Sequence, residues 1–115
     1  MQTFIQERDG ELLVVSADGG LNRETAQQLI ADVGAQVDNG ATSIIVDCSR
    51  LQVINSAGIG VLLQLNRAMK SKNAVVRLAG LQGFVVQAIR LMRLDGVFEL
   101  FADVNAAKLS FRPKS

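Results

Sequence analysis

Short apolar runs alternate with longer segments of helical periodicity along the chain, and this alternation limits the possible folds more than any other feature. The runs Leu12–Val15, Ile44–Val46 and Ala74–Ala79 have the length and the branched side chains of strands. Strands that alternate with helices are usually joined by right-handed crossovers and form a mostly parallel sheet. The clearest helix lies between the first two runs, with apolar residues at helical spacing: Ala26, Leu29, Ile30, Val33 and Val37.

Local signals place the ends of several elements. Arg8-Asp9-Gly10 separates Phe4-Ile5 from Leu12–Val15, and its Asp-Gly pair favours a tight turn between two antiparallel strands. Asn22 is a candidate N-cap for the first helix, and Asn39-Gly40 a candidate left-handed stop. The remaining elements are expected at about Ser56–Met69 (helix), Phe84–Leu94 (helix) and Val97–Phe101 (strand), with a last helix that begins after Asp103.

The expected order is therefore β-β-α-β-α-β-α-β-α. It predicts an α/β fold, or a mixed-sheet α+β sandwich, with a four- to five-stranded, mostly parallel mixed sheet and about four helices. The first strand is expected antiparallel at one side. Residues 1–115 contain no linker or internal repeat, and a chain of 115 residues suits a single domain.

The composition argues against several classes of function. The chain has no His, which removes the commonest general base and metal ligand, so we expect neither a catalytic nor a metal site and no cofactor. Twelve Lys and Arg nearly balance eleven Asp and Glu, and Trp and Tyr are absent, which disfavours nucleic-acid binding. No basic leader or membrane-spanning apolar run is present, so we expect a cytoplasmic protein without direct membrane insertion.

The single cysteine and the apolar residues of the third helix are expected to be structural. Cys48 follows the apolar run Ile44–Val46, which favours a buried small side chain over a nucleophile. Phe84 is expected in the core together with four further apolar residues: Val85, Ile89, Met92 and Leu94. The basic residues Lys70, Lys72, Arg90 and Arg93 are expected at solvated helix ends.

Three short segments carry the functional signal: Gly19-Gly20-Leu21-Asn22, then Asp47-Cys48-Ser49 after a buried strand, then Asn55-Ser56-Ala57-Gly58 at the start of an apolar helix. Their order and spacing resemble the STAS domain, the module shared by sulfate transporters and bacterial anti-sigma factor antagonists. The family often has Gly-Glu-Leu-Asp at the first segment and Asp-Ser-Ser-Gly or Asp-Ser-Thr-Gly at the last.

The resemblance implies a regulatory protein rather than an enzyme. Antagonists of this size bind a serine-kinase anti-sigma factor and so release the sigma factor. The kinase phosphorylates a hydroxyl in the loop before the second helix, which breaks the complex, and a PP2C-type phosphatase restores it. On this basis Ser56 is the candidate phosphorylation site, and the candidate partner-binding residues are Asn22, Asn55, Ser56, Ala57, Gly58, Ile59 and Gly60.

The sequence also departs from the family pattern. The position just before the glycine, which the family usually phosphorylates, is Ala57, and Ser56 is the one hydroxyl left in the loop. The two acidic positions of the pattern are Asn22 and Asn55, so a phosphate on Ser56 would meet less repulsion there. Gly58 and Gly60 weaken a helix, which indicates either close approach by a partner or close packing on the chain's own sheet.

Two other functions stay open. Ala57 favours a STAS scaffold that is never phosphorylated, such as the accessory subunit of an ABC-type lipid transporter or part of a signalling assembly. A small-ligand or nucleotide sensor that uses the same loop is the third possibility. The sequence does not decide whether the protein is a monomer or a weak dimer.

Overall fold

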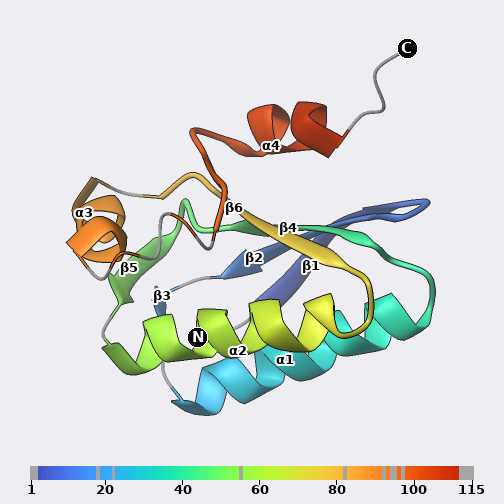
Figure 1. The fold of residues 1–115 in the computed structure, drawn as a ribbon, viewed down its shortest axis with the longest axis horizontal. Coiled ribbons are helices and arrows are strands. Elements are labelled where there is room, and N and C mark those ends of the chain that lie inside the picture. The colour runs from blue at the N-terminus through green and yellow to red at the C-terminus, as the bar shows by residue number, and fades with distance from the viewer. Residues whose placement is uncertain are drawn as a thin grey trace.

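The computed structural model describes residues 3–17, 19–21, 23–54, 56–81, 83–91, 93, 96 and 98–111. For residues 3–4, 17, 19–21, 23–26, 51–54, 56–58 and 61 it describes the backbone alone. Within these ranges the chain forms a five-stranded sheet, a separate two-stranded sheet and four helices (Figure 1). The mixed α/β architecture predicted from the sequence is confirmed.

The main sheet has the strand order β1-β2-β4-β6-β7. Strand β1 pairs with β2 antiparallel, and every other neighbouring pair in this sheet is parallel, as predicted. The Asp-Gly turn joins the antiparallel pair, and Gly10 takes a positive φ of 59° there. The strands are β1 (Thr3–Asp9), β2 (Leu12–Ala17), β4 (Ser43–Asp47), β6 (Val75–Ala79) and β7 (Leu100–Phe101).

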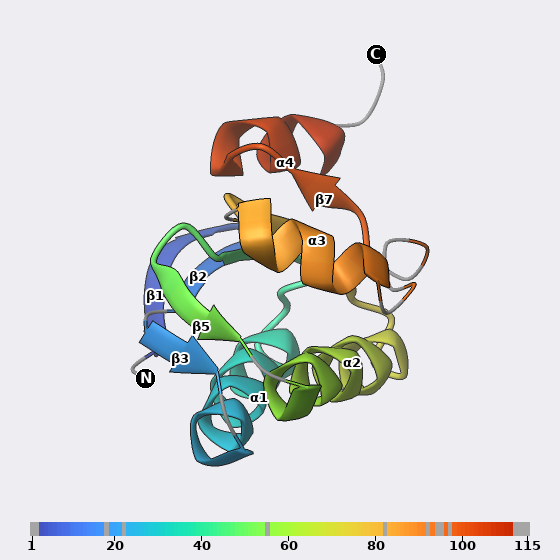
Figure 2. The same ribbon diagram turned by 90° about the vertical axis from the view of Figure 1, so that its left-hand side faces the viewer.

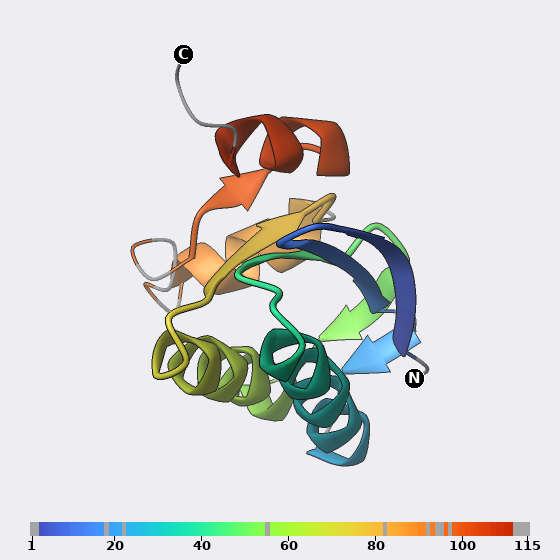
Figure 3. The same cartoon turned by 90° about the vertical axis from the view of Figure 1, so that its right-hand side faces the viewer.

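Helices cover both faces of this sheet. Helices α1 (Arg23–Asp38) and α2 (Ser56–Lys70) lie side by side under one face, and α4 (Val104–Phe111) lies over the other (Figures 1 and 3). Gly40 takes the positive φ (105°) predicted for the stop after α1, and Asp103 accepts a hydrogen bond from the Ala106 N–H (2.8 Å) as the predicted cap of α4.

Alternation along β4 explains why this strand is apolar throughout. Ile44 and Val46 face the large core against the first two helices, whereas Ile45 faces a smaller cluster under α4. All three side chains are fully buried, as predicted for a strand covered on both faces. The smaller cluster also contains Val14, Ala79 and Ala107.

Two strands of the structure are not among those predicted from the sequence. Strand β3 (Gly19–Leu21) and strand β5 (Leu51–Ile54) pair in parallel and form the second sheet. Neither segment stands out in sequence, because β3 has only three residues, two of them Gly, and β5 has only four. A strand this short is stable only with its partner, which lies about 30 positions away in the chain.

The third helix and the last strand are shorter than predicted. Helix α3 (Gly83–Leu91) stops before Arg93, which takes a positive φ of 58° in a turn. Of the strand predicted at Val97–Phe101, the structure shows β7 at Leu100–Phe101, which pairs with β6. The prediction that Phe84 lies in the core is wrong, because 56% of this residue is exposed, whereas Val85 and Ile89 are buried as predicted. Met92, Leu94 and Val97 lie outside the described residues.

Candidate functional site

The pairing of β3 with β5 brings together the first and the last of the three sequence segments that carry the functional signal. Leu21 and Ile54 are register partners at the ends of these strands, and each strand leads directly into a helix. The N-termini of α1 and α2 therefore lie at the same end of the molecule, beside the small sheet (Figure 2). Asn22 and Asn55, which the sequence predicts at this junction, lie outside the described residues.

Helix α2 begins at Ser56, the residue predicted to be phosphorylated. The first turn of a helix has N–H groups without partners inside the helix and carries the positive end of the helix dipole. The first turn of α2 has no acidic residue that would compensate for this positive end. Ser56, Ala57 and Gly58 are helical, and their side chains are outside the described part of the structure.

The next two residues of α2 differ in what they can contact. Ile59, which the sequence predicts to contact a partner, is only 2% exposed, so its side chain packs inside the molecule and not on the surface. Gly60 is half-buried, and a Cβ built at this position would meet no atom within 4 Å. Close packing against the chain's own sheet therefore does not explain Gly60.

A hydrogen-bonded turn after β4 supports the segment that leads to α2. The Asp47 carboxylate accepts hydrogen bonds from the Ser49 N–H (3.0 Å) and from Nε2 of Gln6 (3.0 Å). The Cys48 N–H donates to the carbonyl of Ala79 (2.8 Å), which extends the pairing between β4 and β6. Asp47 therefore fixes the direction in which the chain leaves the main sheet toward β5.

Gly80 makes this turn possible, although the sequence analysis did not single it out. It takes a φ of +73°, and a Cβ at this position would lie 3.1 Å from Cβ of Ser49 and 3.3 Å from Oδ1 of Asp47. Both the backbone conformation and the close contact favour glycine. Its place directly after the apolar strand β6 was the available signal.

Cys48 is buried next to this turn and is not a reactive thiol. It is 1% exposed, and its Sγ lies 3.6 Å from the carbonyl oxygen of Val46. Burial, and to a smaller extent the charge of Asp47, raises the pKa of Cys48 from 9.0 to about 12. The predicted structural role of this cysteine is confirmed.

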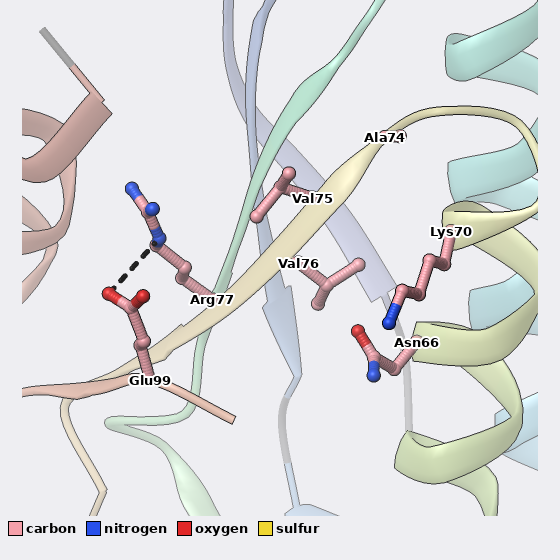
Figure 4. A pocket seen from close by; sticks show the side chains of 7 residues that line it. All are labelled: Asn66, Lys70, Ala74, Val75, Val76, Arg77 and Glu99. Carbon is pink, nitrogen blue, oxygen red and sulfur yellow. Dashed lines mark ion pairs between the residues drawn. The ribbon is translucent and has the colours of Figure 1, made fainter. Parts of the chain in front are cut away.

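A hollow of about 200 Å³ lies on the other side of the molecule from this turn, along β6 (Figure 4). Arg77 points toward Glu99 there, with 3.4 Å between Nε and Oε2, while Asn66 and Lys70 of α2 lie on the opposite side of the strand. The Arg77 guanidinium also donates to Ser110 (2.8 Å) and lies 4.0 Å from the centre of the Phe111 ring. These contacts attach α4 to the sheet, so Arg77 has a structural role.

The described residues show neither a metal cluster nor a helix suited to a bilayer. No group of three or more His, Cys, Asp or Glu side chains among them is placed to hold a metal ion. None of the helices in the described ranges is both long enough and apolar enough to cross a membrane. The basic residues predicted at solvated helix ends are exposed: Lys70, Lys72, Arg90 and Arg93. Lys72 forms an ion pair with Asp38 (2.6 Å).

Comparison with known proteins agrees with this fold. A family model described as the STAS domain matches residues 4–107. BtrV of Bordetella bronchiseptica, whose name assigns it to the anti-sigma factor antagonists, is 28% identical over 112 residues, which are 97% of this chain and 96% of BtrV.

Two solved structures illustrate the likeness. An anti-sigma factor antagonist from Mycobacterium paratuberculosis is 23% identical and superimposes with a TM-score of 0.81 over 97% of this chain and 94% of its own. The Bacillus cell fate determinant SpoIIAA, in its phosphorylated form, is 20% identical and superimposes with a TM-score of 0.73 over 96% and 99%. At these identities the two structures establish the fold.

Proposed function

The chain belongs to the STAS domain family, and we propose that it is an anti-sigma factor antagonist. It binds a serine-kinase anti-sigma factor through the N-terminal end of α2, and phosphorylation of Ser56 releases it from this partner. In this proposal the chain is the substrate and binding partner of other proteins and catalyses no reaction itself. A PP2C-type phosphatase would restore the binding form, and the cytoplasm is the expected compartment.

One observation carries the proposal: the register of β3 and β5 places the start of α2, with Ser56 as its first residue, beside the start of α1. The two segments that resemble the family's functional motifs are therefore neighbours in space, although they are more than 30 residues apart in the sequence. The names of BtrV and of the mycobacterial protein support the same assignment.

The energetics favour a switch that acts on the partner and not on the fold. A phosphate at the first residue of α2 would meet the free N–H groups and the positive end of the helix dipole, which is worth about 0.3 to 1 kcal/mol at an exposed site. The phosphate adds a charge of about −1.5 to −2, and burying it without a partner in an interface costs at least several kcal/mol. Modification of Ser56 should therefore leave the domain folded and break the complex.

The test is phosphorylation by the serine-kinase anti-sigma factor of the same organism. The protein is mixed with this kinase and labelled ATP, and we expect label to enter the wild-type chain and not Ser56→Ala. Ser49→Ala is the matched control, because Ser49 is an exposed hydroxyl in the neighbouring turn, and this variant should still be labelled. Label that persists in Ser56→Ala, or that is lost in Ser49→Ala, would contradict the assignment.

A binding measurement tests the blocking mechanism separately. Ser56→Asp should unfold at the same temperature as wild type and bind the kinase at least tenfold more weakly, because it places a negative charge in the interface. Equal affinity of Ser56→Asp and wild type would refute the mechanism even if Ser56 is phosphorylated.

A STAS scaffold that is never phosphorylated is the second candidate, and Ala57 at the position that the family usually phosphorylates favours it. Absence of label in the wild-type chain, with an intact complex between chain and partner, would support the scaffold. An ABC permease gene beside the gene for this chain would favour it, whereas a kinase or PP2C phosphatase gene would favour the switch.

A further inference from the structure

The apolar side of α3 is wider than the side that the core covers. Val85 and Ile89 are buried against the large core, whereas Phe84 and Leu91 are 56% and 85% exposed. Phe84 and Leu91 are seven residues apart, which is about two helical turns, so they lie on the same side of the helix. This side is apolar at these two positions, and the chain itself does not cover it.

The neighbouring surface of α3 is hollowed and basic. Gln87, Arg90 and Leu91 line an open hollow of about 300 Å³. Arg90 and Arg93 are exposed at the end of the helix, and α3 contains no acidic residue. A surface that combines exposed apolar side chains with positive charge fits a partner whose apolar contact area is bordered by carboxylates.

This surface lies at the end of the molecule that carries the start of α2. In Figure 2, α3 and the N-termini of α1 and α2 all face the viewer, with β3 and β5 at the same end. A protein that docks on the first turn of α2 would therefore have α3 within its reach. By contrast Leu109, which is 60% exposed, belongs to α4 on the other face of the main sheet.

We propose that the outer side of α3, formed by Phe84, Leu91 and Arg90, is a second contact for the same anti-sigma factor that binds the start of α2, and that it receives an apolar patch of that protein bordered by acidic side chains. This inference rests on the proposed function and adds a second site at which the chain contacts the partner.

Binding to the anti-sigma kinase used in the phosphorylation experiment tests the proposal. Leu91→Ala and Phe84→Ala should each weaken binding about tenfold, because large side chains that become buried are the usual centres of an interface. Both residues are more than half exposed in the free chain, so the variants should unfold at the wild-type temperature. Leu109→Ala is the matched control and should bind like wild type.

The charge of the partner is tested by Arg90→Glu. It should weaken binding and reduce the loss of affinity that added salt causes, since it removes an attraction to the partner's carboxylates. If all three α3 variants bind the kinase with the affinity of wild type, the α3 contact is refuted and the proposed function is not affected. If wild type does not bind the kinase at all, both the proposed function and this inference fail.

Discussion

Replacing Gly60 by Ala should stabilise the chain and weaken its complex, and the two effects come from the same open space. A Cβ at position 60 would meet no atom within 4 Å, so the substitution introduces no clash. Ala is favoured over Gly in a helix interior by about 1 kcal/mol, because it loses less backbone entropy on folding. For a chain of 115 residues this corresponds to a rise of about 4 °C in the unfolding temperature.

Two other glycines provide controls for this prediction. Gly34, in α1, would place its Cβ 3.8 Å from Cε of Met69, which is an ordinary contact, so Gly34→Ala should stabilise the chain by a similar amount. Gly80→Ala should destabilise it, because of the positive φ and the 3.1 Å contact with Ser49. Urea unfolding measures the change in the free energy of unfolding for all three variants.

Binding to the anti-sigma kinase then separates Gly60 from Gly34. If the partner approaches the backbone of α2, the added methyl group of Gly60→Ala should lower affinity at least fivefold, whereas Gly34→Ala should bind normally. A lower free energy of unfolding for Gly60→Ala would refute the argument about open space. Greater stability together with normal binding would show that the partner does not use this glycine.

Two further predictions concern the fold. Burial of the Cys48 thiol carries no protonation penalty below pH 9. Above pH 9 the unfolded chain loses this proton while the folded chain, with a pKa of about 12, keeps it. Between pH 9 and 11 the free energy of unfolding should therefore fall more steeply in wild type than in Cys48→Ala, by up to about 1.4 kcal/mol per pH unit. Equal slopes in urea titrations would contradict this. Asp103→Ala should lower the free energy of unfolding by about 1 kcal/mol, because the N-cap bond to the Ala106 N–H is lost. Asn105→Ala, an exposed change on the same helix, should have little effect, and an equal loss of unfolding free energy in both variants would argue against the cap.

Most of the main fold was predictable, because its signals are local. The β-branched run Ile44–Val46 is apolar at every position because helices cover both faces of β4, and the periodicity of α1 reflects burial of one side only. Asp9-Gly10 and Asp103 act through contacts within a few residues. The candidate site was predictable as a set of motifs, and the side chains of Asn22, Asn55 and Ser56 remain outside the described residues.

The features that sequence could not predict all depend on contacts between distant segments. Phe84 and Val85 are adjacent apolar residues in α3. Only the position of the helix on the core decides that Phe84 is exposed and Val85 is buried. Gly80 is indistinguishable from a turn glycine until β4 and β6 bring it so close to Ser49 that an added Cβ would lie 3.1 Å from Cβ of Ser49.

By itself, then, the sequence determined the four helices and the strands of the main sheet to within a few residues, and where a hydroxyl precedes an apolar helix, because propensity, capping and periodicity act over a few residues. The tertiary structure alone decided that the short segments Gly19–Leu21 and Leu51–Ile54 pair with each other and set the starts of α1 and α2 side by side. Such pairing depends on the closure of a loop of about 30 residues, whose entropy is compensated by the packing of the whole domain.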